Sequence, residues 1–220
     1  FLTSQGAQFG AFAGWERATW FAQPGDDVSE ESTQTWKREG PWFQRIKEEC
    51  LAVRDAAGIL DLPGFSRFLV EGTGAADWLR SIITGVVPRI GRLGLAYFAD
   101  EGGRIVTEMS IARLDEDKLL LITAATAEWH DRDWLTRHLP EGGGITITNQ
   151  TLDWSCQILS GPNSRAILAA VCDADLLLTW LTWQRTEIAG CEVMLFRVSF
   201  AGELGWELHS RIGETAKVYG

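Results

Sequence analysis

The segment 198–209, VSFAGELGWELH, constrains the fold of this chain more than any other part of the sequence. It begins with the apolar–polar alternation of a β-strand, is interrupted by two glycines, and continues with Glu207 between a tryptophan and a leucine. Glycine allows the backbone to turn or bulge at such a point. A carboxylate between two large apolar residues is costly to bury unless something pairs with it. The pattern therefore predicts a strand that resumes after a turn and carries a carboxylate in need of a partner.

The partner of Glu207 can be of two kinds. A flat ligand with two adjacent N–H donors would pair well, because two parallel charge-assisted hydrogen bonds fit one carboxylate. The edge of a pterin ring has this pair of donors. The alternative is an ordinary strand whose Glu207 faces solvent or an arginine, since strand carboxylates are commonly exposed. The spacing alone leaves both interpretations open.

Glu108 is a second candidate, on the segment RIVTEMSI (104–111) that follows Gly102-Gly103. Counting in twos along a strand places Val106, Glu108 and Ser110 on one face and mainly apolar residues on the other. A carboxylate there would position a ligand amine or accept its proton, and a solvent-facing strand is the alternative. The sequence contains no dinucleotide-binding fingerprint, no P-loop and no spacing typical of a nucleophile and its base.

The composition excludes several classes of partner. The formal net charge is −10, and no run of basic residues is present, which disfavours nucleic acids and anionic membranes. The four cysteines form no C-x-x-C pair, and the three histidines lack the spacing of metal ligands, so no metal site is predicted. Reduced thiols and the lack of a signal peptide favour the cytoplasm, or the mitochondrial matrix in a eukaryote. The first residue is not Met, and we expect a fragment of a longer polypeptide.

The order of periodic segments predicts an α+β fold with mostly antiparallel sheets and flanking helices. We expect a compact body over residues 42–220, with the first 41 residues as an arm of weak periodicity packed on it. A helix beginning near Trp42 should bury an apolar stripe and end at Gly58. The other expected elements are a hairpin of 93–98 and 105–113, helices over 75–83, 127–139 and 162–171, a second hairpin over 187–200, and strands over 68–71, 118–123, 145–149 and 155–159.

Four segments resemble a known family, and they occur in its order and spacing. They are AVRDAAGILDL (52–62), the Gly102-Gly103 hairpin, LSGP (159–162) and RVSFAGELGWEL (197–208). They resemble the folate-binding region shared by the aminomethyltransferase (T-protein) of glycine cleavage and by dimethylglycine and sarcosine dehydrogenases. The resemblance implies an aminomethyltransferase-type folate-binding fold, here truncated.

The arm is similar, over residues 14–22, to the segment that joins the flavin half to the folate half of the dehydrogenases. This likeness implies that residues 1–41 are a linker from an absent FAD domain. It also implies that residues 42–220 are a folate-binding domain whose following small β-domain is absent.

The implied function is the tetrahydrofolate-binding part of an FAD-dependent N-methyl amine dehydrogenase. It would capture the one-carbon unit as 5,10-methylenetetrahydrofolate. The implied cofactors are tetrahydrofolate and, in the absent domain, FAD, which would also be the intramolecular partner; the small-molecule partners would be folate and the amine. Two alternatives stay open: an aminomethyltransferase acting on a lipoyl carrier protein, and a non-catalytic folate-binding module.

The resemblance also implies roles for individual residues. Glu207 matches the glutamate that holds the pterin edge, and Glu108 falls at the catalytic aspartate, one methylene longer. Phe200 stands where the family often has a tyrosine, and His209 stands where some members have a tyrosine against the ligand, so both are expected to bind the cofactor. Ala124 replaces a ligand-binding asparagine of the aminomethyltransferases, which favours the dehydrogenases.

Overall fold

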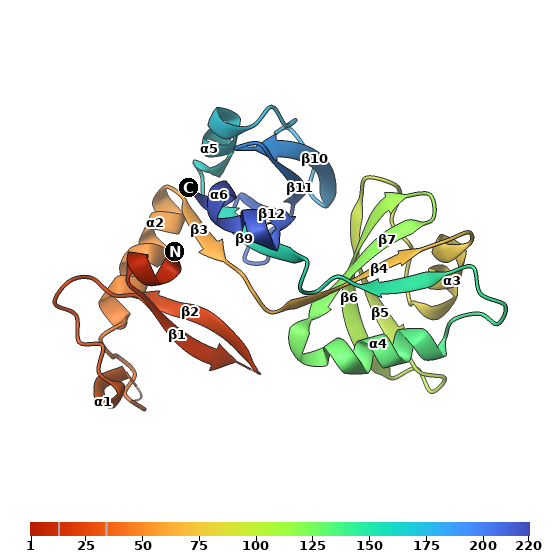
Figure 1. Cartoon of the computed structure of the whole chain (residues 1–220), viewed down its shortest axis with the longest axis horizontal. Coiled ribbons are helices and arrows are strands. Elements are labelled where there is room, and N and C mark those ends of the chain that lie inside the picture. The colour runs from red at the N-terminus through yellow and green to blue at the C-terminus, as the bar shows by residue number, and fades with distance from the viewer. Residues whose placement is uncertain (13, 34) are drawn as a thin grey trace.

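The structure is a computed structural model of the 220-residue chain, and it describes residues 1–12, 14–33 and 35–220. Two five-stranded sheets form the body, and a two-stranded hairpin lies to one side of them (Figure 1). Every strand pair among the described residues is antiparallel. The predicted α+β class with antiparallel sheets and flanking helices is therefore confirmed. Within the described ranges, no helix combines the length and apolar character needed to cross a bilayer.

One sheet, which we call the β6 sheet, has the strand order β5-β6-β7-β4-β8. Its strands are β4 (Phe65–Glu71), β5 (Leu93–Ala99), β6 (Ile105–Asp115), β7 (Lys118–Ala124) and β8 (Thr146–Asn149). The expected hairpin is formed by β5 and β6, and the Asp100 carboxylate closes its turn by accepting from the backbone N–H groups of Gly102 and Arg104. Helices α3 (Ala75–Ile82) and α4 (Glu128–Arg137) pack on its outer face.

The outer face of the β6 sheet holds the largest apolar cluster. Trp78 and Leu79 from α3 and Trp134 and Leu135 from α4 are buried there, as the spacing of both helices predicts. The strand residues in the cluster alternate with residues on the other face, because side chains alternate along a strand. Both predicted helices therefore form for the expected reason, which is burial of one apolar stripe.

The other sheet, which we call the β12 sheet, has the strand order β10-β11-β12-β9-β3. Its strands are β3 (Gly58–Asp61), β9 (Trp154–Ser160), β10 (Thr182–Ile188), β11 (Cys191–Arg197) and β12 (Gly205–Arg211). Helices α5 (Ser164–Val171) and α6 (Thr215–Tyr219) contribute Leu168 and Val218 to the cluster on its outer face. The chain crosses between the sheets twice, from β3 to β4 and from β8 to β9 (Figure 1).

The inner faces of the two sheets meet in a third apolar cluster. The β6 sheet and the β12 sheet both contribute to it, with Leu93, Ala112, Leu120 and Ile122 on one side and Trp154, Met194 and Phe196 on the other. A hydrogen bond from the Trp183 indole to the carbonyl oxygen of Arg113, at 3.0 Å, joins the sheets at the edge of this cluster. The inner faces therefore form one continuous contact that holds the two sheets together.

The N-terminal arm forms regular elements despite the weak periodicity of its sequence. Strands β1 (Ala7–Phe12) and β2 (Trp15–Phe21) form a hairpin, followed by α1 (Glu30–Thr33) and α2 (Phe43–Asp55). Short 3-10 helices complete the described elements at Leu2–Gln5, Ala125–Ala127 and Ile212–Glu214. The arm begins close to the end of the chain, where the Phe1 and Tyr219 rings pack edge to face. The use of residues 1–41 as a linker stays a prediction.

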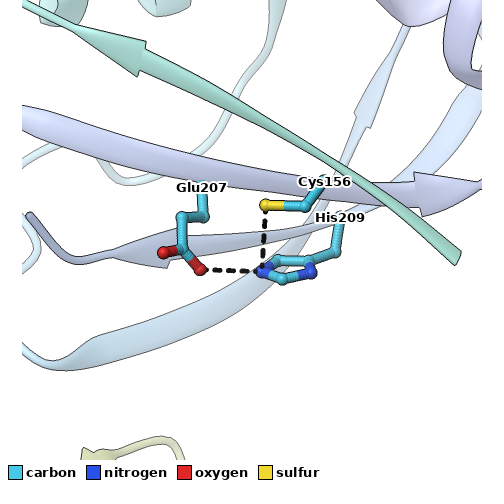
Figure 2. Close-up of side chains that lie close together, drawn as sticks. All are labelled: Cys156, Glu207 and His209. Atoms are coloured by element: carbon cyan, nitrogen blue, oxygen red, sulfur yellow. Dashed lines mark hydrogen bonds and ion pairs between the residues drawn. The ribbon is translucent and has the colours of Figure 1, made fainter. Parts of the chain in front are cut away.

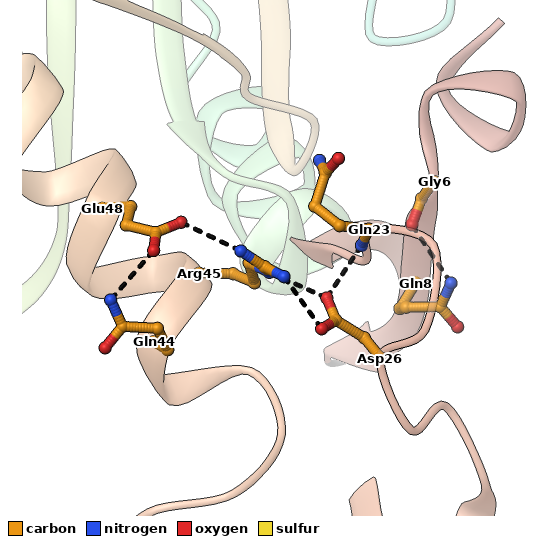
Figure 3. A network of polar contacts seen from close by, with 7 residues as sticks. All are labelled: Gly6, Gln8, Gln23, Asp26, Gln44, Arg45 and Glu48. Atoms are coloured by element: carbon orange, nitrogen blue, oxygen red, sulfur yellow. Dashed lines mark hydrogen bonds and ion pairs between the residues drawn. The ribbon is translucent and has the colours of Figure 1, made fainter.

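An ion pair joins the arm to α2 (Figure 3). The Arg45 guanidinium makes two parallel hydrogen bonds to the Asp26 carboxylate, at 2.8 and 3.0 Å, and a third to Glu48 at 3.2 Å. The bonds from Arg45 to Asp26, together with the backbone N–H of Gln23, hold the pKa of Asp26 below its ordinary value. A bidentate ion pair of this kind fixes the relative orientation of the two side chains as well as their distance.

Helix α2 corrects two expectations. Its predicted apolar stripe is not buried: Phe43 and Cys50 are exposed, and no residue of α2 is buried. The helix ends at Asp55 rather than at Gly58, which already belongs to β3. Gly161 has the positive φ that favours glycine, and a Cβ there would lie 2.6 Å from the carbonyl oxygens of Val53 in the last turn of α2 and of Ala56 just after it, so a close backbone approach requires glycine.

Truncation of Phe196 tests the contact between the sheets. Its side chain is fully buried in the third cluster. We expect Phe196→Ala to lower the free energy of unfolding by about 3–5 kcal/mol, because a large cavity is left between the sheets. The matched control is Phe200→Ala, which removes a fully exposed ring and should change stability by no more than about 0.5 kcal/mol. Urea unfolding measures both, and equal effects of the two substitutions would contradict this packing.

Candidate functional site

The candidate site lies on β12, which runs between β11 and β9 in its sheet. The apolar neighbours Trp206 and Leu208 join the cluster on the outer face, against α5 and α6. Because side chains alternate along a strand, Glu207 and His209 face the β6 sheet. This alternation explains why Glu207 stands between two large apolar residues in the sequence. Those two residues pack on the outer face, while Glu207 faces the interior between the sheets.

Three side chains from neighbouring strands meet on this inner face (Figure 2). The Nε2 atom of His209 lies 3.0 Å from Oε2 of Glu207 and 3.9 Å from the sulfur of Cys156. Cys156 stands directly opposite His209 in the register of β9 and β12. The imidazole is 1% exposed and the glutamate side chain 25% exposed, so Glu207 is the member of the group that solvent reaches. The predicted cofactor-binding residues Glu207 and His209 are therefore in direct contact.

Arg67 approaches this group from the facing sheet. It is a buried residue of β4, and its Nη1 donates to the carbonyl oxygens of Phe65 and, across the sheets, Trp154. Its Nε and Nη2 have no hydrogen-bond partner among the described residues. Burial lowers the pKa of Arg67, while Cys156 and Glu207 act in the opposite direction. A buried guanidinium therefore lies within electrostatic reach of the Glu207 carboxylate.

The four side chains of this group, from Arg67, Cys156, Glu207 and His209, differ in charge. Burial, and secondarily Glu207, raise the pKa of the Cys156 thiol well above its ordinary value. Burial lowers the pKa of His209, although the hydrogen bond to Glu207 opposes that shift. Both groups are consequently neutral near pH 7, because burial disfavours the charged form of each. Arg67 and Glu207 carry the two opposite charges.

The same three side chains offer sulfur, oxygen and nitrogen atoms within 4.8 Å of one another, a donor set that zinc accepts. The spacing of the histidines in the sequence did not indicate such a group. The guanidinium of Arg67 already supplies a positive charge beside the thiol and the carboxylate. A second cation there would be repelled, so the arrangement favours a protein-supplied counter-charge over a metal.

Glu108 lies on the inner face of the facing sheet, as period-two counting predicts. Its neighbour two residues on in β6, Ser110, pairs with Ile122 of the third cluster, while Met109 and Ile111 pack in the cluster on the outer face. Tyr97 stands opposite Glu108, and hydrogen bonding to the Glu108 carboxylate raises the pKa of the Tyr97 phenol. The side chain of Glu108 is exposed, so it is not part of the buried group around Glu207.

Val106 departs from that counting. The register of β5 and β6 shifts between Phe98 and Ala99, and Val106 packs with the cluster on the outer face instead of sharing a face with Glu108. A bulge of this kind adds one residue to one strand and so interrupts the alternation.

Phe200 is placed apart from Glu207. It belongs to the loop between β11 and β12, its ring is fully exposed, and it lines a surface hollow of about 400 Å³ with Trp180 and Arg197. A second hollow of about 660 Å³ lies between α5, α6 and β3. Glu207 and Glu108 line neither of these two hollows. A cofactor-binding role of Phe200 stays a prediction, and it requires the loop to bring the ring toward the site.

Arg67 and Cys156 are the members of the group that the sequence analysis missed. A signal for Arg67 exists, since it interrupts the apolar run FSRFLV (65–70) in the way that Glu207 interrupts its own strand. A charged residue in such a run needs a partner when buried. Cys156 gives no comparable signal, because a small buried thiol is unremarkable in a core strand. Only the register of β9 against β12 brings it to His209.

Known proteins similar to this chain fall into two groups. The mitochondrial dimethylglycine dehydrogenase of Rattus norvegicus is 29% identical over 214 residues, which are 96% of this chain and 25% of that protein. The aminomethyltransferase of Bacillus velezensis is 32% identical over 174 residues, which are 77% of this chain and 47% of that protein. The chain therefore spans between a quarter and a half of the length of these relatives.

Solved structures share the fold. The glycine cleavage aminomethyltransferase T of Bartonella henselae superposes with a TM-score of 0.79 at 22% identity, covering 99% of this chain and 53% of that one. A chain of the heterotetrameric sarcosine oxidase of a Corynebacterium species superposes with a TM-score of 0.57 at 18% identity, over 82% of this chain. The family described as the GCVT N-terminal domain matches residues 1–220. This chain therefore belongs to the GCVT N-terminal domain family and is related to both dimethylglycine dehydrogenases and aminomethyltransferases.

Proposed function

We propose that this chain is the tetrahydrofolate-binding part of an FAD-dependent N-methyl amine dehydrogenase and forms 5,10-methylenetetrahydrofolate there. The amine and the folate are then its small-molecule partners, and the FAD belongs to another domain of the same polypeptide. The observation that carries the proposal is the Glu207 carboxylate, which faces the β6 sheet from an interior strand and is reached by solvent on one side.

The residues of the site fit the pterin end of a folate. Oε2 of Glu207 accepts from His209, while Oε1 makes no hydrogen bond to any described residue. A carboxylate offers about four lone-pair sites, so most of its acceptor capacity is available to a ligand. Two adjacent N–H donors match that capacity through parallel charge-assisted bonds. The glutamate side chain is 25% exposed, so a ligand would reach the carboxylate from the solvent side.

The extent of the two sequence matches favours the dehydrogenase, although the superposition on an aminomethyltransferase T also covers 99% of this chain. The match to the rat dimethylglycine dehydrogenase extends over 214 residues, and the match to the Bacillus aminomethyltransferase over 174. The longer match therefore includes most of the arm. An aminomethyltransferase is the second candidate, and the 32% identity to the Bacillus protein favours it. A flavin domain on the same polypeptide would decide for the first candidate.

The residues of the chain have separable roles in this proposal. A bound tetrahydrofolate supplies two amine nitrogens that take up a one-carbon unit. Glu207 orients the ring from the β12 sheet. Glu108 lies on the inner face of the β6 sheet with its side chain exposed, where it would position an amine or accept its proton. A folate held between these two carboxylates would raise the effective concentration of the one-carbon unit beside the nitrogens that take it up.

Glu207→Gln tests the binding role. Loss of a charge-assisted hydrogen bond is worth about 1.5–3 kcal/mol, so we expect the affinity for 5-formyltetrahydrofolate, a stable folate, to fall about tenfold or more. Calorimetry with the purified chain measures it, and thermal melting checks that the variant remains folded. Glu187→Gln, on the exposed edge strand of the same sheet, is the matched control and should bind as the unmodified chain does. Equal affinity of Glu207→Gln and the control would exclude the pterin role.

Glu108→Gln tests the catalytic role in the flavin-containing protein. The substitution keeps the size of the side chain and removes its charge. We expect amine oxidation, followed by reduction of a dye, to be unchanged. Formation of methylenetetrahydrofolate should slow by about 10²-fold or more, the usual contribution of a positioned acid or base. Glu101→Gln, in the turn of the same hairpin, is the control. Unchanged rates of both steps would show that Glu108 has no catalytic role, and they would favour the non-catalytic binding module.

A further inference from the structure

His209 has no direct access to a ligand, yet it touches the carboxylate that the proposed function uses. It is 1% exposed, and the Phe196 ring lies against the imidazole with 4.4 Å between the ring centres. Its Nε2 contacts Oε2 of Glu207 at 3.0 Å. The imidazole therefore lies behind the carboxylate, on the side away from solvent.

The protonation state of the ring follows from its surroundings. Nδ1 is buried and has no partner among the described residues. A proton on Nδ1 would be a buried donor without an acceptor, which costs the full desolvation of that group. A proton on Nε2, in contrast, is donated to a carboxylate. The ring is therefore neutral, with its proton on Nε2 and a bare Nδ1.

The charged and titratable groups facing the ring agree with this state. Glu207 on the same strand attracts a second proton, whereas Arg67 from β4 repels one and Cys156 from β9 is a neutral thiol. Burial outweighs the attraction, and the pKa of His209 lies below its ordinary value of 6.5. The contact of Nε2 with the sulfur, at 3.9 Å, is too long to compete with the bond to Glu207.

We propose that His209 is a positioning residue: its neutral imidazole, protonated on Nε2, holds one oxygen of Glu207 and so presents the free acceptor sites of that carboxylate to the N–H edge of a folate. The inference rests on the proposed function. It differs from the role implied by the family, in which the residue at this position lies against the ligand. A fixed carboxylate loses less rotational freedom on binding, which favours affinity.

The tautomer is measured directly by long-range ¹H–¹⁵N NMR of the histidine-labelled chain at pH 7. We expect His209 to show the pattern of a neutral ring with its proton on Nε2, and this pattern to be absent from the spectrum of His209→Gln. A proton on Nδ1, or a doubly protonated ring, would overturn the proposal. This measurement needs no ligand, so it is independent of the proposed function.

Binding of 5-formyltetrahydrofolate tests the consequence. We expect His209→Phe to weaken binding about fivefold, the equivalent of one ordinary hydrogen bond. His209→Gln should retain the affinity, because its amide N–H reaches a position similar to that of Nε2. His130→Gln, an exposed histidine of α4, is the control.

The outcomes separate the two proposals. Loss of affinity in Glu207→Gln together with unchanged affinity in His209→Phe would overturn the positioning role and leave the folate role intact. Unchanged affinity in both variants would overturn both. If His209→Phe fails to fold, the tautomer measurement decides the proposal alone.

The pH dependence of stability provides a further prediction. Below pH 6.5 the unfolded chain takes up a proton on His209, while the folded chain does so only at lower pH. Acidification from pH 6.5 therefore favours unfolding. We expect the free energy of unfolding, measured with urea, to fall less between pH 6.5 and 5.5 in His209→Gln than in the unmodified chain, whose other groups are the same. Identical slopes would contradict a neutral buried imidazole.

Discussion

The contact between the inner faces of the two sheets is the interaction on which the rest of the structure depends. Neither sheet can bury its inner face alone, because helices cover only the outer faces. The third cluster joins them through residues such as Phe196 and Trp154. Hydrogen bonds from Arg67 and Trp183 to carbonyl oxygens of the opposite sheet fix their relative position. Every residue proposed to act on a ligand from a strand faces this contact.

The polar group in this contact contains two opposite charges that lie within electrostatic reach of each other. Arg67 and Glu207 are opposite charges, and the thiol and imidazole between them are neutral. Glu207 is 25% exposed and makes no ion pair with Arg67 among the described residues, so their attraction contributes little net stability. Removal of Glu207 would still leave the buried guanidinium without its nearby counter-charge. In the role proposed above, the group orients Glu207 and is not a source of stability.

Local elements were predictable where burial of one face decides the structure. The hairpin of β5 and β6 follows from a turn sequence that Asp100 closes, and α3 and α4 follow from their apolar stripes. The arm was not predictable, because its hairpin carries almost no buried residue: only Ala7 and Trp20 are buried in β1 and β2. Helix α2 shows the converse, since it forms at the predicted place while no residue of its stripe is buried. The apolar periodicity of a segment indicates its secondary structure, but not whether another part of the protein buries its apolar face.

By itself, the sequence determined the α+β class, the strand that carries Glu207 and the face that carries Glu108, because these depend on alternation and turns within short segments. Tertiary structure decided which side chains meet. The register of β9 against β12 brings Cys156 to His209, and the packing of one sheet on the other brings Arg67 to Glu207. Such pairings join residues far apart along the chain, and no local pattern encodes them. For the same reason, only the tertiary structure places the ring of His209 behind the carboxylate.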